Sequence, residues 1–259
     1  MRNVLLAVLL VISCTSFIVA GHLYWQKKID ATVRQAMTKA TEFQVAHEQE
    51  AKRMAYAKKL PAEVQAKIKR AIETNRPLRL VIAGSEATPA SKDGWPALLK
   101  QQLEAAYGNE VFQVVIKEYK GMTTKQAIDE NIAEQLIKEK PDIVLWEPFL
   151  LNNNGVININ DTFQHIDTII QTITDTLPDV TILLQPPHPI YNAIYYPEQV
   201  KQFQAFAKEK GYIYIDHWKA WPDYKSNELN KYVDPDTDLP TKDGQKRWAD
   251  FLAGYFIAK

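Results

Sequence analysis

The chain lacks the residues that mark disulfide-rich or nucleic-acid-binding proteins. It has 259 residues but one cysteine, Cys14, and equal numbers of basic and acidic residues, 31 of each. One cysteine excludes an intrachain disulfide and a thiolate metal cluster. Without an excess of positive charge the chain has little with which to neutralise phosphates, so we expect no nucleic-acid partner. No metal ion or other cofactor is expected either.

Glycine is absent between residues 26 and 75, and Pro61 is the only proline there. This stretch predicts a helical stalk over residues 26–76, in two pieces, with Pro61 at the start of the second. Residues 26–76 hold twelve basic and six acidic residues, so the rest of the neutral chain is acidic. Apolar residues at spacings of three and four form a narrow stripe: Ile29, Val33, Ala36, Ala40 and Phe43. The stripe predicts either a surface for an envelope protein partner or a helix that packs on, or spaces, its own domain. We favour the second because no a/d pattern extends over several heptads.

The N-terminal segment is the one long apolar run. Residues 4–25 carry no charge and are long enough for a helix to cross a bilayer, with Arg2 before them and Lys27 and Lys28 after them. We predict an uncleaved anchor over residues 1–25. Two alternatives remain open, a lipoprotein modified at Cys14 and a signal peptide cleaved after Ala20. Each of the three places the domain at a cell membrane or beyond it.

From residue 77 the pattern changes to short apolar runs that alternate with amphipathic stretches, which indicates a parallel sheet covered by helices. The prediction is an α/β fold, a flavodoxin-like three-layer sandwich with a five-stranded parallel sheet, over residues 77–259. The predicted strands are 78–83, 111–116, 142–146, 180–184 and 212–215. The predicted helices are about 94–107, 123–139, 161–176, 197–210 and 242–257, the last with Thr241 as its N-cap.

Polar residues follow every predicted strand. In open α/β sheets, ligands bind at the carboxyl ends of the strands, so these residues are the first candidates for chemistry. They are Ser85 and Glu86, then Lys120 and Gly121, then Glu147 with Asn152 to Asn154, then Gln185 and His188, and last Asp216 and His217.

This layout resembles the SGNH/GDSL hydrolase family, whose motifs place a nucleophilic serine after the first strand, a glycine after the second and an asparagine after the third. Ser85 in Ile82-Ala83-Gly84-Ser85 matches the first motif, with Gly84 at the place of the Asp in GDS. The resemblance implies that Ser85 attacks an ester carbonyl and that Gly121 and Asn152 donate hydrogen bonds to the oxyanion.

The family's last motif, DxxH followed by proline, supplies the catalytic Asp and His. Here the stretch is Asp236-Thr237-Asp238-Leu239-Pro240, so Asp236 matches the Asp and Leu239 stands in place of the His. A leucine takes no proton, and the base must come from elsewhere. His217 and His188 follow the fifth and fourth strands, and either is a candidate if its loop folds over the sheet.

Aromatic residues in the same loops suit a ligand that contains sugars, because their rings stack on apolar sugar faces. They are Tyr191, Tyr195, Tyr196, Trp218, Trp221 and Tyr224, with Trp95 nearer to Ser85. The leading hypothesis is a membrane-anchored bacterial ester hydrolase that acts outside the cell on acyl or acetyl esters of a small molecule or a cell-surface polysaccharide. The alternative is an inactive protein of the same fold that serves as a binding or assembly component of envelope polysaccharide production.

Overall fold

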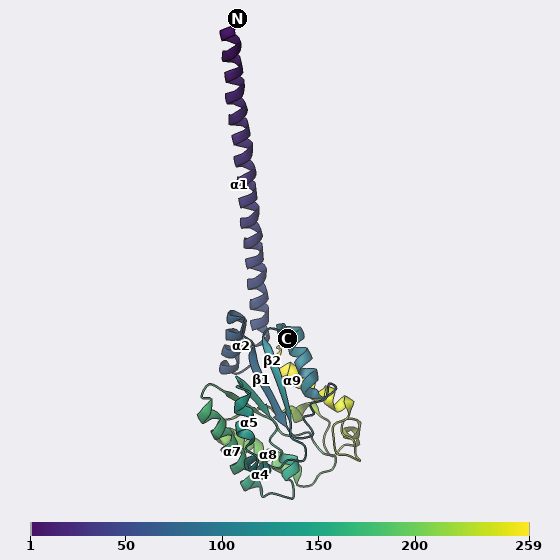
Figure 1. Cartoon of the computed structure of the whole chain (residues 1–259). Helices are drawn as coiled ribbons and strands as arrows, with labels where there is room; N and C mark the ends of the chain where they lie inside the picture. Colours follow the sequence, from purple (N-terminus) through teal and green to yellow (C-terminus); the bar gives the residue numbers. More distant parts are fainter. Residues whose placement is uncertain (1, 259) are drawn as a thin grey trace. The chain divides into compact units, whose positions relative to one another are not determined.

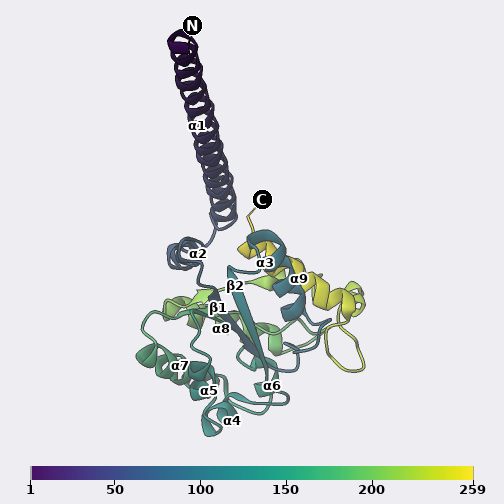
Figure 2. The same ribbon diagram turned by 45° about the horizontal axis from the view of Figure 1, so that its top comes forward.

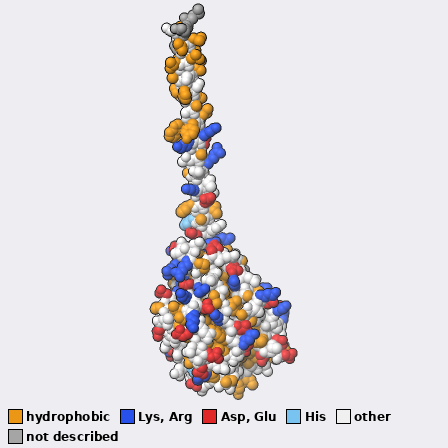
Figure 3. Space-filling view, in the orientation of Figure 1, with side chains coloured by type: hydrophobic (Ala, Val, Ile, Leu, Met, Phe, Trp, Pro, Cys, Tyr) orange, Lys and Arg blue, Asp and Glu red, His pale blue; other side chains and the backbone are white. Residues whose placement is uncertain are grey.

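A single long helix opens the chain. The computed structural model describes residues 2–258, and in it α1 runs without a break over Arg2–Tyr56. Among the described residues, α1 is the one helix that is long and apolar enough to cross a membrane, by length and composition alone. Figure 3 shows apolar side chains around its first part and basic side chains further along. The predicted anchor and the first piece of the predicted stalk therefore form one helix.

The chain divides into two units, Met1–Lys52 and Arg53–Lys259. Helix α2 (Ala62–Thr74), which the sequence analysis placed in the stalk, belongs to the second unit. Its Val64, Ile68 and Ala71 are buried, since their spacing of three and four puts all of them on the face toward the core. The folded domain thus begins before residue 77, the start that the sequence analysis gave it.

Five parallel strands form one sheet in the order β2-β1-β3-β4-β5, which confirms the predicted α/β fold with its five-stranded parallel sheet. The strands are β1 (Leu78–Gly84), β2 (Phe112–Glu118), β3 (Ile143–Trp146), β4 (Thr181–Leu184) and β5 (Ile213–Tyr214). Strand β1 lies between β2 and β3. The residues that follow these three strands therefore meet at one edge of the sheet.

Helices cover both faces of the sheet (Figures 1 and 2). One layer contains α2, α3 (Trp95–Tyr107) and α9 (Lys242–Phe256), and Leu80 and Ile82 point into it. The alternate residues Val81 and Ala83 point to the other layer, because successive side chains of a strand face opposite sides. That layer is built from α4 (Thr124–Asp129), α5 (Ile132–Lys138), α7 (Ile159–Thr176) and α8 (Tyr196–Glu209).

Two local features differ from the prediction. The single helix expected over 123–139 is two helices, because Asn131 has a left-handed backbone (φ 53°) that interrupts the helical ladder. A short helix, α6 (Leu150–Asn153), follows β3 and was not predicted. The predicted cap of the last helix is confirmed, since the Thr241 side chain accepts a hydrogen bond from the Gly244 amide. Two short 3-10 helices, His217–Ala220 and Asn227–Lys231, lie between β5 and α9.

Candidate functional site

Ser85 lies directly after β1 and is bonded to a carboxyl group from the neighbouring strand. Its hydroxyl donates to Glu147 Oε2 over 2.6 Å, and its backbone N–H donates to the same oxygen over 2.8 Å. The side chain is buried, with 2 % of its surface exposed. Glu147 follows β3, which pairs with β1 in a register that brings Ala83 opposite Trp146. We call Ser85 and Glu147 the inner pair.

Burial dominates the ionisation of Glu147. It raises the pKa of the carboxyl group to about 7, although hydrogen bonds from the side chain and backbone of Ser85 and from the Phe149 backbone favour the ionised form. Gly84 leaves room for this carboxyl group, because a Cβ there would lie 2.9 Å from Glu147 Oε2 and closer still to the Thr88 side chain. The sequence analysis did not assign Glu147 a role, although its position after the strand beside β1 was the available signal.

The residues predicted to bind an oxyanion come together, but they do so around Glu86. The Gly121 backbone N–H donates to Glu86 Oε2 over 2.9 Å, and Asn152 Nδ2 donates to the same oxygen over 3.1 Å. Burial opposes the charge on Glu86. The hydrogen bonds from the backbones of Gly121 and Glu86 and from the Asn152 side chain outweigh it and hold the pKa of Glu86 below its ordinary value. We call Glu86, Gly121 and Asn152 the outer cluster.

Local backbone geometry positions the two donors. Gly121 has φ +63°, a conformation that glycine adopts without the strain of a side chain. Phe149, just before α6, has φ 58°, which is unusual for an aromatic residue and turns the chain sharply after β3. This turn starts α6, which carries Asn152.

The three consecutive asparagines have different roles. Asn153 is buried and donates to the hydroxyls of Thr124 and Thr162, so it fastens α6 to the neighbouring helices. Asn154 is exposed. Of the three, Asn152 alone donates to Glu86. Its position is the one expected of an oxyanion donor, but its partner is the Glu86 carboxylate.

His188 is fully buried near the outer cluster. Its Nε2 lies 2.6 Å from the Asp238 carbonyl oxygen, and its Nδ1 has no hydrogen-bond partner among the described residues. Because a carbonyl oxygen only accepts, Nε2 carries the hydrogen and Nδ1 keeps its lone pair. Burial lowers the pKa of His188 to about 4, so the ring is neutral at pH 7, although the nearby Glu86 charge opposes this shift.

His217 uses both ring nitrogens in the packing of its loop. Its Nε2 lies 2.8 Å from the Pro186 carbonyl oxygen, and its Nδ1 accepts a hydrogen bond from Trp221 Nε1. The ring stacks on Trp248 with centroids 4.2 Å apart. Burial lowers the pKa of His217 to about 3. These contacts are those of a packed, neutral histidine, and neither histidine forms a hydrogen bond with Ser85 in the part of the chain that the structure describes.

The loop of the predicted last motif does not place Asp236 beside either histidine. Asp236 is exposed, and its backbone N–H donates to the Asp234 carboxylate. The contact with His188 comes from the Asp238 backbone instead. Within residues 2–258, no carboxylate side chain orients His188 or His217, so the triad that the resemblance implies is not assembled.

The aromatic residues divide into core and surface. Trp95, Tyr196 and Trp221 are buried, so they belong to the packing, whereas Tyr195 is 74 % exposed. The half-exposed members are Tyr191, Trp218 and Tyr224. The loops after β4 and β5 are joined by hydrogen bonds from Trp218 Nε1 to the Pro187 carbonyl and from the Asn192 N–H to the Tyr224 carbonyl. The two loops therefore form one surface.

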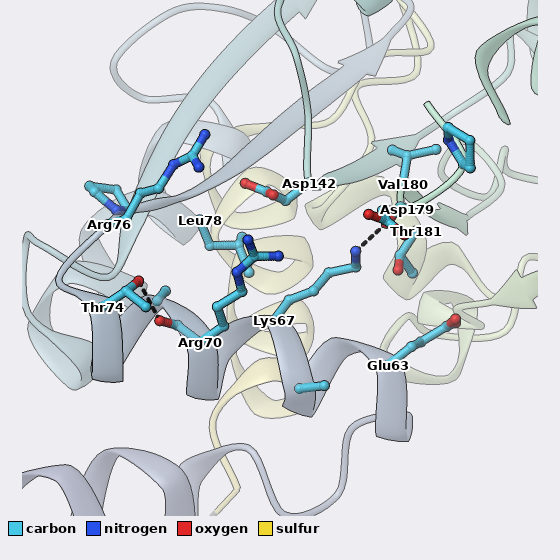
Figure 4. Close-up of a pocket in the computed structure, with 14 residues that line it drawn as sticks. Glu63, Lys67, Arg70, Thr74, Arg76, Leu78, Asp142, Asp179, Val180 and Thr181 are labelled. Atoms are coloured by element: carbon cyan, nitrogen blue, oxygen red, sulfur yellow. Dashed lines mark hydrogen bonds between the residues drawn. The ribbon is translucent and has the colours of Figure 1, made fainter. Parts of the chain in front are cut away.

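A cavity of about 490 Å³ lies at the opposite edge of the sheet, between α2 and the amino ends of β1, β3 and β4 (Figure 4). Its charged lining is mixed, and Lys67 already donates to the Asp179 carbonyl. Three basic and three acidic side chains face it: Lys67, Arg70, Arg76, Glu63, Asp142 and Asp179. Because these charges balance and lie far from the inner pair along the strands, we place the candidate site at the carboxyl edge.

Comparison with solved structures found proteins of similar fold. A protein assigned to the lipolytic G-D-S-L family from Desulfitobacterium hafniense aligns with a TM-score of 0.57 at 20% identity, over 68% of this chain and 98% of its own. The domain has the SGNH/GDSL hydrolase fold. No protein-family model and no curated protein matches the sequence.

Several other solved structures that align with the domain are named as esterases. A peptidoglycan O-acetylesterase aligns with a TM-score of 0.62 at 12% identity, over 72% of this chain and 93% of its own. An acetylxylan esterase from Geobacillus stearothermophilus aligns with a TM-score of 0.54 at 18% identity, over 69% and 94% of the two chains. At these identities the likeness establishes the fold.

The first SGNH motif has two registers in this chain. The sequence analysis matched Ser85 with the nucleophilic serine of GDS. Counted from Gly84 as the glycine of GDS, Ser85 takes the place of the Asp and Glu86 the place of the nucleophile. The hydrogen bonds of Gly121 and Asn152 fit the second register, because both donors meet at Glu86. Ser85 as the nucleophile stays a prediction.

Proposed function

We propose that this domain is a non-hydrolytic SGNH-fold protein that binds a polysaccharide ligand of the cell envelope and is tethered to the membrane by its N-terminal helix. One observation carries the proposal: both expected oxyanion donors, Gly121 N–H and Asn152 Nδ2, are already hydrogen-bonded to the Glu86 carboxylate. An ester substrate needs those donors as negative charge develops on its carbonyl oxygen. The Glu86 carboxylate competes with the carbonyl oxygen of a substrate for these two donors.

The proton chemistry of the site supports the same conclusion. A serine hydroxyl needs a base to become a nucleophile. This chain has Leu239 at the position where the family motif has the histidine base. His188 and His217 hydrogen-bond to backbone carbonyls, and in the described part of the chain neither hydrogen-bonds to the Ser85 hydroxyl. The Ser85 hydroxyl instead donates to Glu147.

The ligand class rests on the neighbours and on the loop surface. Two proteins of the same fold are named for action on acetylxylan and on peptidoglycan, both of them polysaccharides. In this chain Tyr191, Trp218 and Tyr224 are half-exposed on the joined loops beside the site. Aromatic faces at such positions bind sugar rings without requiring a nucleophile. We also propose that the N-terminal helix is an uncleaved membrane anchor and that the domain lies outside the cytoplasm.

A second function is favoured by the inner pair. The 2.6 Å contact between Ser85 Oγ and Glu147 Oε2, with the pKa of Glu147 at about 7, has the form of a nucleophile and a carboxylate base. In that case the chain is an ester hydrolase that uses Ser85, as the leading hypothesis from sequence has it.

A single assay separates the two functions. Full-length protein in detergent micelles is incubated with 4-nitrophenyl acetate, next to Ser85→Ala and Glu147→Gln. We expect all three to release nitrophenol at the rate of buffer, because the oxyanion donors are occupied. Hydrolysis by the parent that falls at least 10²-fold in both variants would refute the proposal and establish the hydrolase.

A further inference from the structure

Glu86 is an ionised side chain with no counter-ion among the described residues. Its Oε2 accepts from two neutral donors, Gly121 N–H and Asn152 Nδ2. None of the ion pairs among residues 2–258 includes Glu86. The side chain is half-buried, and a carboxylate withdrawn from water is costly unless a positive charge is near.

The groups around Glu86 do not supply that positive charge. Burial keeps His188 and His217 neutral at pH 7, since it lowers their pKa values to about 4 and about 3. The nearest other carboxyl group, Glu147, adds negative charge whenever it ionises. The net charge of the site is therefore negative at pH 7. This is unexpected, because the family resemblance assigns the donors Gly121 N–H and Asn152 Nδ2 to an oxyanion.

A second acceptor lies in the same site. The Nε2–H of His188 donates to the Asp238 carbonyl, which leaves Nδ1 as a lone-pair acceptor. This atom is buried, has no partner among the described residues, and belongs to a ring within electrostatic range of Glu86. Buried polar groups in folded proteins nearly always have a partner, so this unpaired acceptor adds to the demand for hydrogen-bond donors around Glu86.

We infer that the site binds the ammonium group of its ligand, as carried by a polysaccharide of amino sugars that lack N-acetyl groups. This inference rests on the proposed polysaccharide-binding function. An ammonium group brings N–H donors and a positive charge to the Glu86 carboxylate. A metal ion fits less well, because no group of three or more His, Cys, Asp or Glu side chains suited to a metal occurs in the described part of the chain.

The same geometry discriminates against the acetylated sugar. An acetamide group is neutral, and its carbonyl oxygen needs a donor. The Gly121 and Asn152 donors are already hydrogen-bonded to Glu86. The carboxylate oxygens of Glu86 would repel the carbonyl oxygen of the acetamide group. With Glu86 in place, the site therefore favours a sugar whose amine or hydroxyl is free over the same sugar carrying an acyl group.

The test uses two oligosaccharides that differ only in the acetyl groups. Binding of a glucosamine tetramer and of an N-acetylglucosamine tetramer to the full-length protein in micelles is measured by titration calorimetry. We expect the glucosamine tetramer to bind at least tenfold more tightly. Glu86→Gln should remove that advantage, because the amide still accepts from Gly121 and Asn152 but carries no charge.

Glu228→Gln is the matched control, since Glu228 is an exposed carboxylate on another loop. It should leave both affinities unchanged, which excludes general attraction of a cationic sugar to an acidic domain. A thermal melt shows whether Glu86→Gln remains folded.

Equal affinities for the two tetramers, unchanged in Glu86→Gln, would overturn the ammonium site but leave the proposed polysaccharide binding in place. Binding of neither tetramer would overturn the ammonium inference as well. The ester assay would still decide separately whether the domain is hydrolytic.

Discussion

The inner pair and the outer cluster lie side by side but differ in what they hold. Ser85 is buried, and its hydroxyl is bonded to a carboxyl group with a raised pKa. Glu86 is half-exposed and ionised, and it is bonded to the two residues expected to bind a substrate. The comparison teaches that adjacent residues after one strand can have quite different partners, so the hydrogen-bond donors around a residue carry information that its type alone does not.

The sharpest way to break this comparison is to remove the Glu147 carboxyl group. Glu147→Ala leaves three buried donors without this acceptor: the Ser85 N–H, the Ser85 hydroxyl and the Thr88 hydroxyl. At about 1–3 kcal/mol for each unsatisfied buried group, we expect the free energy of unfolding to fall by about 3 kcal/mol or more. Urea unfolding measures it. A loss under about 1 kcal/mol would mean that the inner pair is not structural.

The pH dependence of stability gives a somewhat smaller effect. The folded-state pKa of Glu147, about 7, lies above its ordinary value of 4.5, so the folded protein holds this proton more tightly than the unfolded chain. The resulting stability is full below about pH 4.5 and is lost as pH rises through 7. Relative to Glu147→Gln, the parent should lose about 3 kcal/mol between pH 4.5 and 8. A constant difference between the two proteins over that range would contradict this pKa.

The smallest effect concerns the outer cluster. In Asn152→Ala, Glu86 loses one of the hydrogen bonds that keep its pKa low, so that pKa should rise toward the ordinary value. Carbon-13 NMR of labelled glutamate carboxyl groups follows the titration. The neighbouring Asn154→Ala is the control, because Asn154 is exposed and does not contact Glu86. Equal titration in both variants would show that Asn152 does not hold the carboxylate.

Sequence reasoning located the elements better than it located the chemistry. Strands of Leu, Val and Ile between helical stretches define a parallel sheet, so the residues after each strand could be taken as candidates from the sequence. Gly121 and Asn152 were found in this way and do come together. The partner that they share was not foreseen, because two adjacent residues after one strand point in different directions.

The histidines show a second limit. His188 and His217 both follow strands, at the carboxyl edge of the sheet, which made both of them candidate bases. Their hydrogen bonds go to the Asp238 and Pro186 carbonyls. Such backbone acceptors belong to loops that can be placed only once the chain has folded, and no residue pattern marks them.

The sequence by itself determined the apolar N-terminal helix and the five-stranded parallel sheet, because both depend on hydrophobic periodicity, which is local along the chain. It also determined that Leu239 stands where the family motif has a base. Only the tertiary structure decided that Glu147 receives the Ser85 hydroxyl and that Glu86 occupies the oxyanion donors. Those contacts join residues about 30 to 70 positions apart, and their hydrogen bonds depend on distances that only packing fixes.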